Sequence, residues 1–465
     1  MLDDIIHFLS AMFVSTNPFT GEILFEREFL DADSLDRHLQ QADDAFSAWA
    51  ALPVAERARQ VALLAPALEA ELDLLAGTIT REMGKPVDQA RAEVAKCASL
   101  CRYYAEHAEP FLTPQKRFFE DKKAIVRFDP LGAVFAIMPW NYPFWQVFRF
   151  GIPALLAGNA ALLKPAPNVG QCGLAIEELL SRHLSVPGVF QALFVDTHQV
   201  ERIIASPVVQ GVTLTGSDRA GSAVAALAGK YLKKCVMELG GSDPYLVLAD
   251  ADLDKAAEIG VQARLNNNGQ TCIAAKRFIV QDAVYETFKA RLLDRLKPLE
   301  AGAPEDEAVL LTTMARQDLR DELKNQVEAS VAKGAQIAWD MPLPSDGPPY
   351  RMGPLVLEGA RPGMPAYDEE LFGPVFTLLR APDEEAAVRL ANATPYGLGA
   401  SIWTQDESKA LKIAARLQAG AIAVNDMVKS DPRLPFGGVK RSGFGRELGR
   451  EGLLEFTNVK TIVLG

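Results

Sequence analysis

The sequence predicts an α/β protein with two doubly wound parallel-sheet domains. Short apolar, β-rich runs alternate with helical segments from about residue 131 to 240, and a second alternating series runs from about residue 245 to 425. Buried strands separated by helices indicate right-handed βαβ crossovers and a parallel sheet. The chain has 465 residues, of which 49% are hydrophobic, which suffices for two large domains or three smaller ones.

The first part of the chain, from about residue 34 to 108, has a helical pattern. Apolar residues recur there at spacings of three and four, and few helix breakers interrupt them. The spacing is seen at Val61, Leu64, Leu68, Leu72 and Leu75. We therefore expect helices to precede the first sheet.

The strands expected in the first sheet are AVFAIMP, AALLKP, VFQALFV, GVTLTG and KKCVMEL, with helices around 146–156, around 172–183 and after Ser217. The second series comprises YLVLAD, RFIVQD, PVFTLL, GASIWT and GAIAVN, and the break between the two lies near Gly240 and Gly241. Proline and glycine are dense between about residues 342 and 365, which predicts a surface loop.

Charge and composition exclude several classes of function. Lys and Arg number 48 against 60 Asp and Glu, a net charge of −12, which argues against a nucleic-acid partner. No uninterrupted apolar stretch reaches the roughly 18 residues of a membrane helix. The N-terminal apolar run follows Asp3 and Asp4 rather than basic residues, so we expect no export signal. Met12 is an alternative natural start.

Cysteine usage favours a reducing, cytoplasmic location. Five cysteines in a chain of this length are too few and too scattered for a disulfide framework. Cys97 and Cys101 are spaced i, i+4, as neighbours on one helix face. With only five histidines and no C-x-x-C motif, no metal site is expected.

The sharpest local feature is Cys272 in NNNGQTCIAAKR, residues 266–277, where it follows a polar turn that contains glycine. A cysteine on such a loop is either a nucleophile or one more small buried side chain, and the motif alone favours neither. A nucleophilic thiol needs a base or a lowered pKa, and a donor for the oxyanion that it creates.

Two residues offer these functions. Glu238 ends an apolar strand before a glycine pair in MELGG, at the sheet edge where α/β proteins bind ligands. Asn141 follows the strand AVFAIM, and its amide could donate to an oxyanion. The ordinary alternatives are a solvated strand-end acid for Glu238 and a turn residue before a helix for Asn141.

The segment TLTGSDRAG, residues 213–221, reads as a strand, a Gly216-Ser217 turn and a helix start. It could bind a nucleotide phosphate, although it matches neither G-x-G-x-x-G nor a Walker loop. Lys164 ends the strand AALLK as a cation at a sheet edge. It is either a phosphate or ribose ligand or an ordinary strand-end lysine.

Together these motifs resemble the aldehyde dehydrogenase superfamily, from about residue 15 to the C-terminus. The residues that carry the resemblance occur in one order along the chain. They are Asn141 in PWNYP, Lys164 in LLKPAPN, TGS at 215–217, Glu238 in ELGG, Cys272 in GQTC, Glu370 in EELFGPV and Asn425 before PFGGVKRSGFGRE.

The resemblance implies a covalent mechanism. Cys272 matches the nucleophile that attacks the aldehyde to give a thiohemiacetal, and later a thioester that water hydrolyses. Asn141 matches the side-chain donor to the oxyanion, beside the backbone N–H of the cysteine. Glu238 matches the general base, whose pKa we expect an apolar strand end to raise.

The resemblance also implies an NAD or NADP cofactor. Residues expected to bind it are Trp140 and Lys164 on the adenosine side, Gly216, Ser217 and Leu239 near the pyrophosphate turn and the following strand end, Glu370 at the nicotinamide ribose and Phe372 near the nicotinamide. NAD-selective relatives carry Glu three residues after the lysine, where this chain has Pro167. Without that carboxylate a reason to exclude NADP is lost, so we expect both cofactors to be usable.

For the substrate, the resemblance is closest to bacterial succinate-semialdehyde dehydrogenases. Members acting on that semialdehyde carry Arg eight residues after the asparagine, here Arg149, and Ser five residues before PFGG, here Ser430. A guanidinium can bind a carboxylate in bidentate fashion; the alternative for Arg149 is an ion pair on an exposed helix. A second Arg of some relatives is Asn266 here.

Three alternatives remain open from the sequence. The substrate could be glutarate semialdehyde or a neutral aliphatic or aromatic aldehyde. The chain could be a non-catalytic member of the fold, against which the presence of Asn141, Glu238 and Cys272 argues. A CoA-acylating variant is disfavoured, because such relatives often lack the glutamate.

The resemblance implies an aldehyde dehydrogenase-like architecture and a homodimer or homotetramer. The NAD(P)-binding Rossmann-like domain is expected over 1–114 and 131–240, and the catalytic domain over 241–436. A small β oligomerisation arm and C-terminal segment are expected over 115–130 and 437–465.

Overall fold

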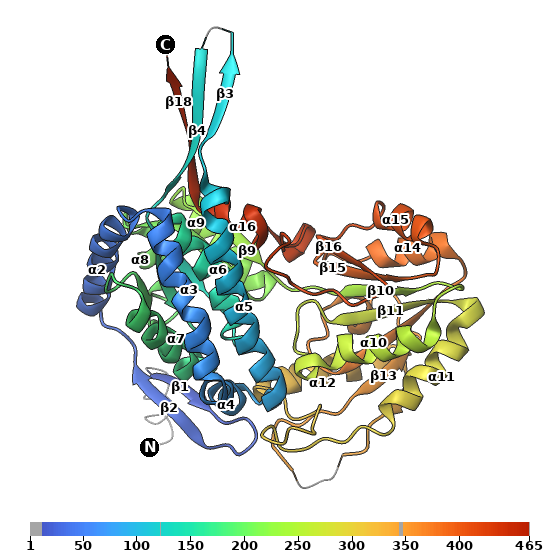
Figure 1. The fold of residues 1–465 in the computed structure, drawn as a ribbon. Helices are drawn as coiled ribbons and strands as arrows, with labels where there is room; N and C mark the ends of the chain where they lie inside the picture. The colour runs from blue at the N-terminus through green and yellow to red at the C-terminus, as the bar shows by residue number, and fades with distance from the viewer. Residues whose placement is uncertain (1–11, 121, 344–346, 465) are drawn as a thin grey trace.

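The computed structural model describes residues 12–120, 122–343 and 347–464, which form two α/β domains and a projecting β arm (Figure 1). Parallel sheets of six and seven strands form the centres of the two domains. This confirms the predicted fold class. No helix in these described ranges is long and apolar enough to cross a membrane.

The first sheet has the order β17-β9-β8-β5-β6-β7, and all its neighbours are parallel except β17, which is antiparallel to β9. The order reverses between β5 and β8, so a crevice opens beyond the carboxyl ends of these two strands. Its strands are β5 (Ala133–Ile137), β6 (Ala160–Lys164), β7 (Phe190–Ala192), β8 (Val209–Thr215), β9 (Lys234–Glu238) and β17 (Gly443–Phe444).

Helices pack against this sheet because the spaced apolar residues of the N-terminal segment are buried there, including Val61, Leu64 and Leu68. Cys97 and Cys101 are both buried in α5. The helices of the domain are α2 (Ala32–Ala50), α3 (Val54–Ala70), α4 (Leu72–Met83), α5 (Val87–Leu112), α6 (Trp145–Ala157), η1 (Pro167–Val169), α7 (Gly170–His183), α8 (Val200–Ala205), α9 (Asp218–Lys230) and α16 (Gly449–Glu455).

The second sheet has the order β12-β13-β14-β11-β10-β15-β16, with β12 antiparallel at one edge. Its strands are β10 (Asp243–Val247), β11 (Ala275–Gln281), β12 (Gln336–Asp340), β13 (Leu355–Glu358), β14 (Val375–Ala381), β15 (Gly399–Trp403) and β16 (Ala421–Val424). Its helices are α10 (Leu253–Leu265), η2 (Asn266–Gly269), η3 (Asp282–Val284), α11 (Tyr285–Leu296), α12 (Gln317–Ala332), α13 (Pro365–Asp368), α14 (Glu384–Asn392), α15 (Glu407–Ala414) and η4 (Lys440–Ser442).

The prediction of a surface loop between about residues 342 and 365 is wrong for the middle of this segment. Residues Leu355–Glu358 form β13, which lies between β12 and β14 inside the second sheet. The strand has only four residues and is flanked by proline and glycine, so its local pattern resembles a loop. Its three apolar residues, LVL, are buried by the sheet and its helices, and such tertiary burial overrides local propensity.

The arm consists of β3 (Gln115–Phe119), β4 (Lys122–Pro130) and β18 (Thr457–Leu464) in an antiparallel sheet. Figure 1 shows it projecting away from both domains. Of the expected C-terminal segment 437–465, only β18 joins the arm, because β17 pairs with β9 in the first sheet. The register Gly443↔Glu238 brings the segment after PFGG back beside the strand that carries Glu238.

At the other end, β1 (Met12–Thr16) pairs antiparallel with β2 (Ile23–Glu28). Met12 is thus the first residue of a strand. The N-terminal run on which the expectation about an export signal rests lies mostly in residues 1–11, outside the described residues.

A buried ion pair anchors the loop between β5 and α6. The Lys85 ammonium pairs with Glu93 of α5, and both side chains are buried. The other oxygen of Glu93 accepts hydrogen bonds from the backbone N–H groups of Phe144 at 2.9 Å and Trp145 at 3.0 Å. Lys85 also lies 3.7 Å from the ring centroid of Tyr142. The loop that contains Asn141 is therefore held by a buried ion pair between α5 and the α4–α5 connection.

Glu93→Gln should destabilise the protein by about 3 kcal/mol, because it leaves the buried Lys85 charge without its partner. Urea unfolding should show this as a lower midpoint. Glu69→Gln is the matched control, since Glu69 pairs with Arg102 at the exposed surface and such pairs contribute little. Equal midpoints for the two variants would contradict a structural role for the buried pair.

Candidate active site

Cys272 lies on a strained loop between α10 and β11. Three consecutive residues have left-handed backbone conformations: Asn267 at φ 55°, Asn268 at φ 53° and Gly269 at φ 74°. Asparagine tolerates this region better than most residues. At Gly269 a Cβ atom would come within 2.5 Å of the Gly373 backbone, so this position requires glycine. The NNNG sequence therefore encodes the turn that presents the thiol.

Side-chain amides stabilise this turn. The Asn268 amide donates to the Thr312 hydroxyl at 2.9 Å and to the Thr313 carbonyl. The Asn267 amide donates to the carbonyls of Gln270 at 3.2 Å and Asn141 at 2.9 Å. The second of these bonds crosses from the second domain to the first.

Asn141 faces the same loop from the other side. Its amide nitrogen donates to the Gln270 carbonyl at 2.9 Å, and its oxygen accepts from the Gln146 amide at 3.0 Å. One amide hydrogen of Asn141 remains for a ligand, because an amide nitrogen carries two donors. Asn141 and Cys272 are thus brought together from opposite domains.

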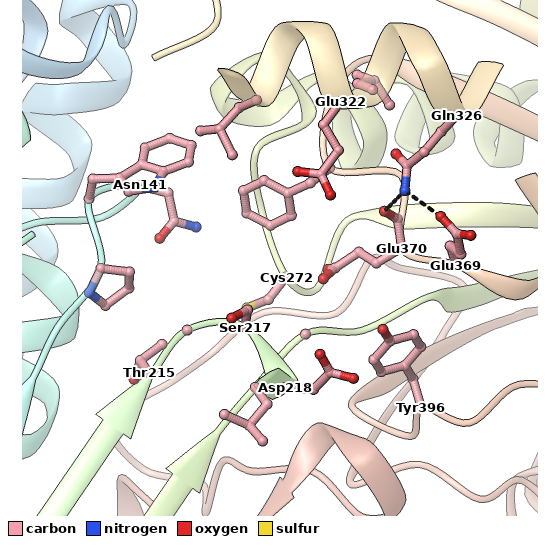
Figure 2. A pocket seen from close by; sticks show the side chains of 18 of the residues that line it. Asn141, Thr215, Ser217, Asp218, Cys272, Glu322, Gln326, Glu369, Glu370 and Tyr396 are labelled. Carbon is pink, nitrogen blue, oxygen red and sulfur yellow. Dashed lines mark hydrogen bonds between the residues drawn. The ribbon is translucent and has the colours of Figure 1, made fainter. Parts of the chain in front are cut away.

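A cavity of about 350 Å³ opens between the domains and reaches Cys272 (Figure 2). Figure 2 shows Asn141 on one side of this space and Glu370 with Gln326 on the other. Its lining includes six of the eight residues predicted to bind the cofactor, namely Trp140, Gly216, Ser217, Leu239, Glu370 and Phe372. Sequence reasoning missed Glu322, Gln326 and Tyr396, because distant segments contribute them without a local motif.

Lys164 and Pro167 are not among the residues lining this cavity. Lys164 ends β6, its side chain is mostly buried, and burial lowers its pKa. Trp140, which the resemblance grouped with Lys164, instead packs edge to face on Phe372, with ring centroids 5.9 Å apart. Trp140 lines the same cavity as Cys272, whereas Lys164 does not line it.

The N-terminus of α9 opens at this cavity. Ser217 caps the helix by accepting a hydrogen bond from the Ala220 N–H at 3.2 Å. The first N–H groups of a helix and its dipole favour an anion. The Gly216-Ser217 turn therefore suits a phosphate.

Glu370 is tied to the Cys272 loop through Lys276. One Glu370 oxygen accepts the Gly241 N–H at 3.0 Å and pairs with the Lys276 ammonium at 3.1 Å. The ammonium also donates to the backbone carbonyls of Cys272 at 2.7 Å and Thr271 at 3.0 Å. Sequence reasoning did not single out Lys276. The signal that could have drawn attention to it is a lysine directly after the cysteine loop.

A second cavity, of about 220 Å³, meets the first at Cys272 and Gln146. It is lined by both residues predicted to bind the substrate, Arg149 and Ser430, and by Asn266. Further polar lining comes from Lys96, Lys429, Gln89, Glu93, Tyr142 and Thr271. A reactive thiol at the junction of two cavities can meet a different ligand from each side.

The comparisons with known proteins agree with this geometry. The sequence profile of the aldehyde dehydrogenase family matches residues 9–462. This chain belongs to the aldehyde dehydrogenase family. The dehydrogenase is 45% identical to a succinate semialdehyde dehydrogenase [NAD(P)+], Sad, of Escherichia coli K12 over 449 residues, 97% of each chain.

Other relatives of this aldehyde dehydrogenase are similarly close. A probable succinate-semialdehyde dehydrogenase [NADP(+)] of Synechocystis is 44% identical, over 96% of this chain and 98% of the relative. The solved structure of succinic semialdehyde dehydrogenase from Streptococcus pyogenes with NADP+ has a TM-score of 0.95 at 33% identity, covering 97% and 99% of the two chains.

The guanidinium of Arg149 already binds a carboxylate of the dehydrogenase itself. It pairs with Glu447 in the segment after β17, and both side chains are buried. It also lies 4.8 Å from the ring centroid of Phe436. Burial acts to lower the pKa of Arg149, but the Glu447 and Glu238 carboxylates outweigh it and raise the pKa. The alternative for Arg149 was an ion pair on an exposed helix. The ion pair exists, but it is buried, so the predicted exposure is wrong.

Glu238 is buried, and its carboxyl oxygens have no hydrogen-bond partner among the described residues. Burial raises its pKa well above the ordinary value, and the nearby Glu447 carboxylate adds to this effect. The direction agrees with the expectation for a base at an apolar strand end. The side chain lines neither cavity; it lies against Gly437 of the PFGG segment.

Burial raises the pKa of the Cys272 thiol to about 11, although the Arg149 and Lys276 cations favour the thiolate. In the cofactor-free protein, alkylation of Cys272 by iodoacetamide should therefore become about tenfold faster per pH unit between pH 7 and 10, because only the thiolate reacts. Peptide mass spectrometry would follow the site, with Cys272→Ser as the control. A rate that levels off near pH 7 would contradict this pKa.

Proposed function

We propose that this chain oxidises succinate semialdehyde to succinate, with NAD or NADP as the hydride acceptor. The observation that carries the proposal is the position of Cys272 at the junction of two cavities. One cavity is lined by a helix N-terminus and by the Glu370 carboxylate, which suits a dinucleotide. The other carries the cations Lys96 and Arg149, which suits an anionic aldehyde.

In the first half of the reaction, the Cys272 thiolate adds to the aldehyde carbon. The free amide hydrogen of Asn141 and the backbone N–H of Cys272 donate to the oxyanion of the thiohemiacetal. Such donors are typically worth about 3 to 4 kcal/mol of transition-state stabilisation. Lys276 holds the backbone of the nucleophile through the Cys272 carbonyl and thereby keeps that N–H in place.

In the second half, water hydrolyses the thioester on Cys272, and Glu238 takes a proton from that water. Burial raises its pKa well above the ordinary value, and a carboxylate with a raised pKa is a stronger base. Because its carboxyl lies against Gly437 and outside both cavities, this role requires the side chain to rotate toward Cys272. The adjacent Leu239 and Gly240 line the first cavity, so a short movement suffices.

The cofactor would be held by residues of the first cavity. The α9 N-terminus with Gly216 and Ser217 suits the pyrophosphate, and Glu370 suits ribose hydroxyls, because its second oxygen has no hydrogen-bond donor among the described residues. Phe372 and Trp140 form an apolar wall near Cys272. When bound, the dinucleotide supplies the oxidant by accepting a hydride. Lys164 and Pro167, at the end of β6 and the start of η1, would face the adenosine end.

The carboxylate of the substrate would enter the second cavity. Arg149 and Ser430 line it together, as the resemblance implied. Glu447 balances the charge of Arg149. Arg149 therefore offers the substrate carboxylate one edge of its guanidinium and a positive electrostatic field, but not an unpaired charge.

We further propose that the arm joins copies of the chain into a homodimer or homotetramer in the cytoplasm. Large apolar side chains on the arm are exposed, including Phe118 at 71% and Val459 at 60%. Exposed apolar strands are typical of surfaces that pair with another chain. The five cysteines are free, as a reducing compartment requires.

Steady-state kinetics with each cofactor test the function. The value of kcat/KM for succinate semialdehyde should exceed that for butanal by at least about 30-fold, because only the semialdehyde gains a buried ionic contact. Glutarate semialdehyde tests how well the cavity tolerates one more methylene. Faster oxidation of butanal than of either semialdehyde would refute the anionic substrate.

Pro167→Glu should lower kcat/KM with NADP by about tenfold or more and leave the value with NAD within about threefold. The new carboxylate would repel a 2′-phosphate, and a like-charge contact costs more than 1 kcal/mol. Pro167→Gln, which adds the same bulk without charge, is the control. Equal loss with both cofactors, or the same loss in the glutamine variant, would contradict the assignment.

A further inference from the structure

The second cavity contains a lysine that sequence reasoning did not single out. Lys96 lies on α5, and its ammonium donates to the Ser430 hydroxyl oxygen at 2.9 Å. The same ammonium lies 4.0 Å from the ring centroid of Trp145. The indole N–H of Trp145 donates to the same Ser430 oxygen at 3.0 Å. Lysine, serine and tryptophan thus form one cluster on the cavity wall.

Ser430 has an unused donor in this cluster. A hydroxyl oxygen accepts two hydrogen bonds and donates one. Lys96 and Trp145 supply the two accepted bonds, so the Ser430 proton must point to another acceptor. The side chain is 7% exposed, and a buried donor without a partner is costly. An acceptor in the cavity would satisfy it.

The charge of Lys96 also lacks a close partner. Within the described residues, no ion pair of 4.0 Å or less joins its ammonium to a carboxylate, and the two carboxylates whose charges act on it are committed elsewhere. Glu93 binds Lys85, and Asp431 pairs with Arg433 at 2.6 Å. By contrast, Arg149 in the same cavity has its charge balanced by Glu447. Lys96 is therefore the cation here that an incoming anion can neutralise.

We propose that Lys96 and Ser430 form the carboxylate clamp of the substrate cavity, in which the ammonium pairs with the substrate carboxylate and the Ser430 hydroxyl donates to it. This inference rests on the proposed function and deepens it. Charge-assisted hydrogen bonds of this kind are the strong ones, and the Trp145 ring keeps the ammonium in position through a cation–π contact.

The environment of Lys96 gives the clamp a pH dependence. Burial, together with the Arg149 cation, lowers the pKa of Lys96 to about 8, and Glu93, Asp431 and Cys97 oppose this. The free clamp is therefore charged at neutral pH and loses its charge above about pH 8. The ratio of kcat/KM for succinate semialdehyde to that for butanal should fall above this pH, because effects on Cys272 and Glu238 cancel in the ratio.

Lys96→Met tests the clamp directly. It should raise KM for succinate semialdehyde by about 30-fold and change kcat/KM for butanal by less than about threefold, which also shows that the variant folds. In this variant, the ratio of kcat/KM for succinate semialdehyde to that for butanal should no longer fall above pH 8. Lys96→Arg should bring KM for succinate semialdehyde most of the way back to the wild-type value. Lys429→Met is the matched control, because Lys429 lines the same cavity but is exposed and paired with Asp426 at 3.1 Å.

Inhibition of butanal oxidation by succinate separates the clamp from the proposed substrate. If wild-type protein does not prefer succinate semialdehyde, the proposed function fails, yet the clamp still requires Lys96→Met to weaken succinate inhibition about 30-fold. Equal inhibition constants for wild type and Lys96→Met would overturn the clamp. So would equal effects on both aldehydes, or a Lys429→Met variant that behaves like Lys96→Met.

Discussion

The active site depends on one set of hydrogen bonds, which joins the loop after β5 to the loop before β11. Asn141 donates to the Gln270 carbonyl, and Asn267 donates back to the Asn141 carbonyl. Both bonds are buried and cross between the domains, where water cannot compete for them. They hold the oxyanion donor and the nucleophile in register, and the left-handed turn over Asn267 and Asn268 is tolerated because its amides are bonded.

A second constraint is the balance of charge inside an acidic protein. Three buried cations near the site each face an acid: Lys85 faces Glu93, Arg149 faces Glu447 and Lys276 faces Glu370. A buried pair costs desolvation but leaves no isolated charge. Lys96 departs from this arrangement, since its partners are a hydroxyl and an aromatic ring. The net charge of −12 thus coexists with a locally positive cavity.

Much of the fold followed from local pattern. The parallel strands β5, β6, β7, β8 and β9 of the first sheet and β10, β11, β14, β15 and β16 of the second were predicted from apolar runs, and the N-terminal helices from apolar spacing. The short strand β13 was not, because burial rather than composition makes it a strand. The return of β17 to the first sheet was also missed, since a two-residue strand has no pattern of its own.

What the sequence determined by itself was the family, the class of fold and the candidate nucleophile, because motifs around Cys272, Asn141 and Glu238 are local and keep their order. Only the tertiary structure decided which side chains share a cavity and which charges are already balanced. Lys96, Trp145 and Ser430 form one cluster, although Lys96 and Ser430 are 334 positions apart in the chain. Glu447 pairs with Arg149 from near the C-terminus. Such pairings arise from the packing of separate helices and loops, and no spacing in the chain encodes them.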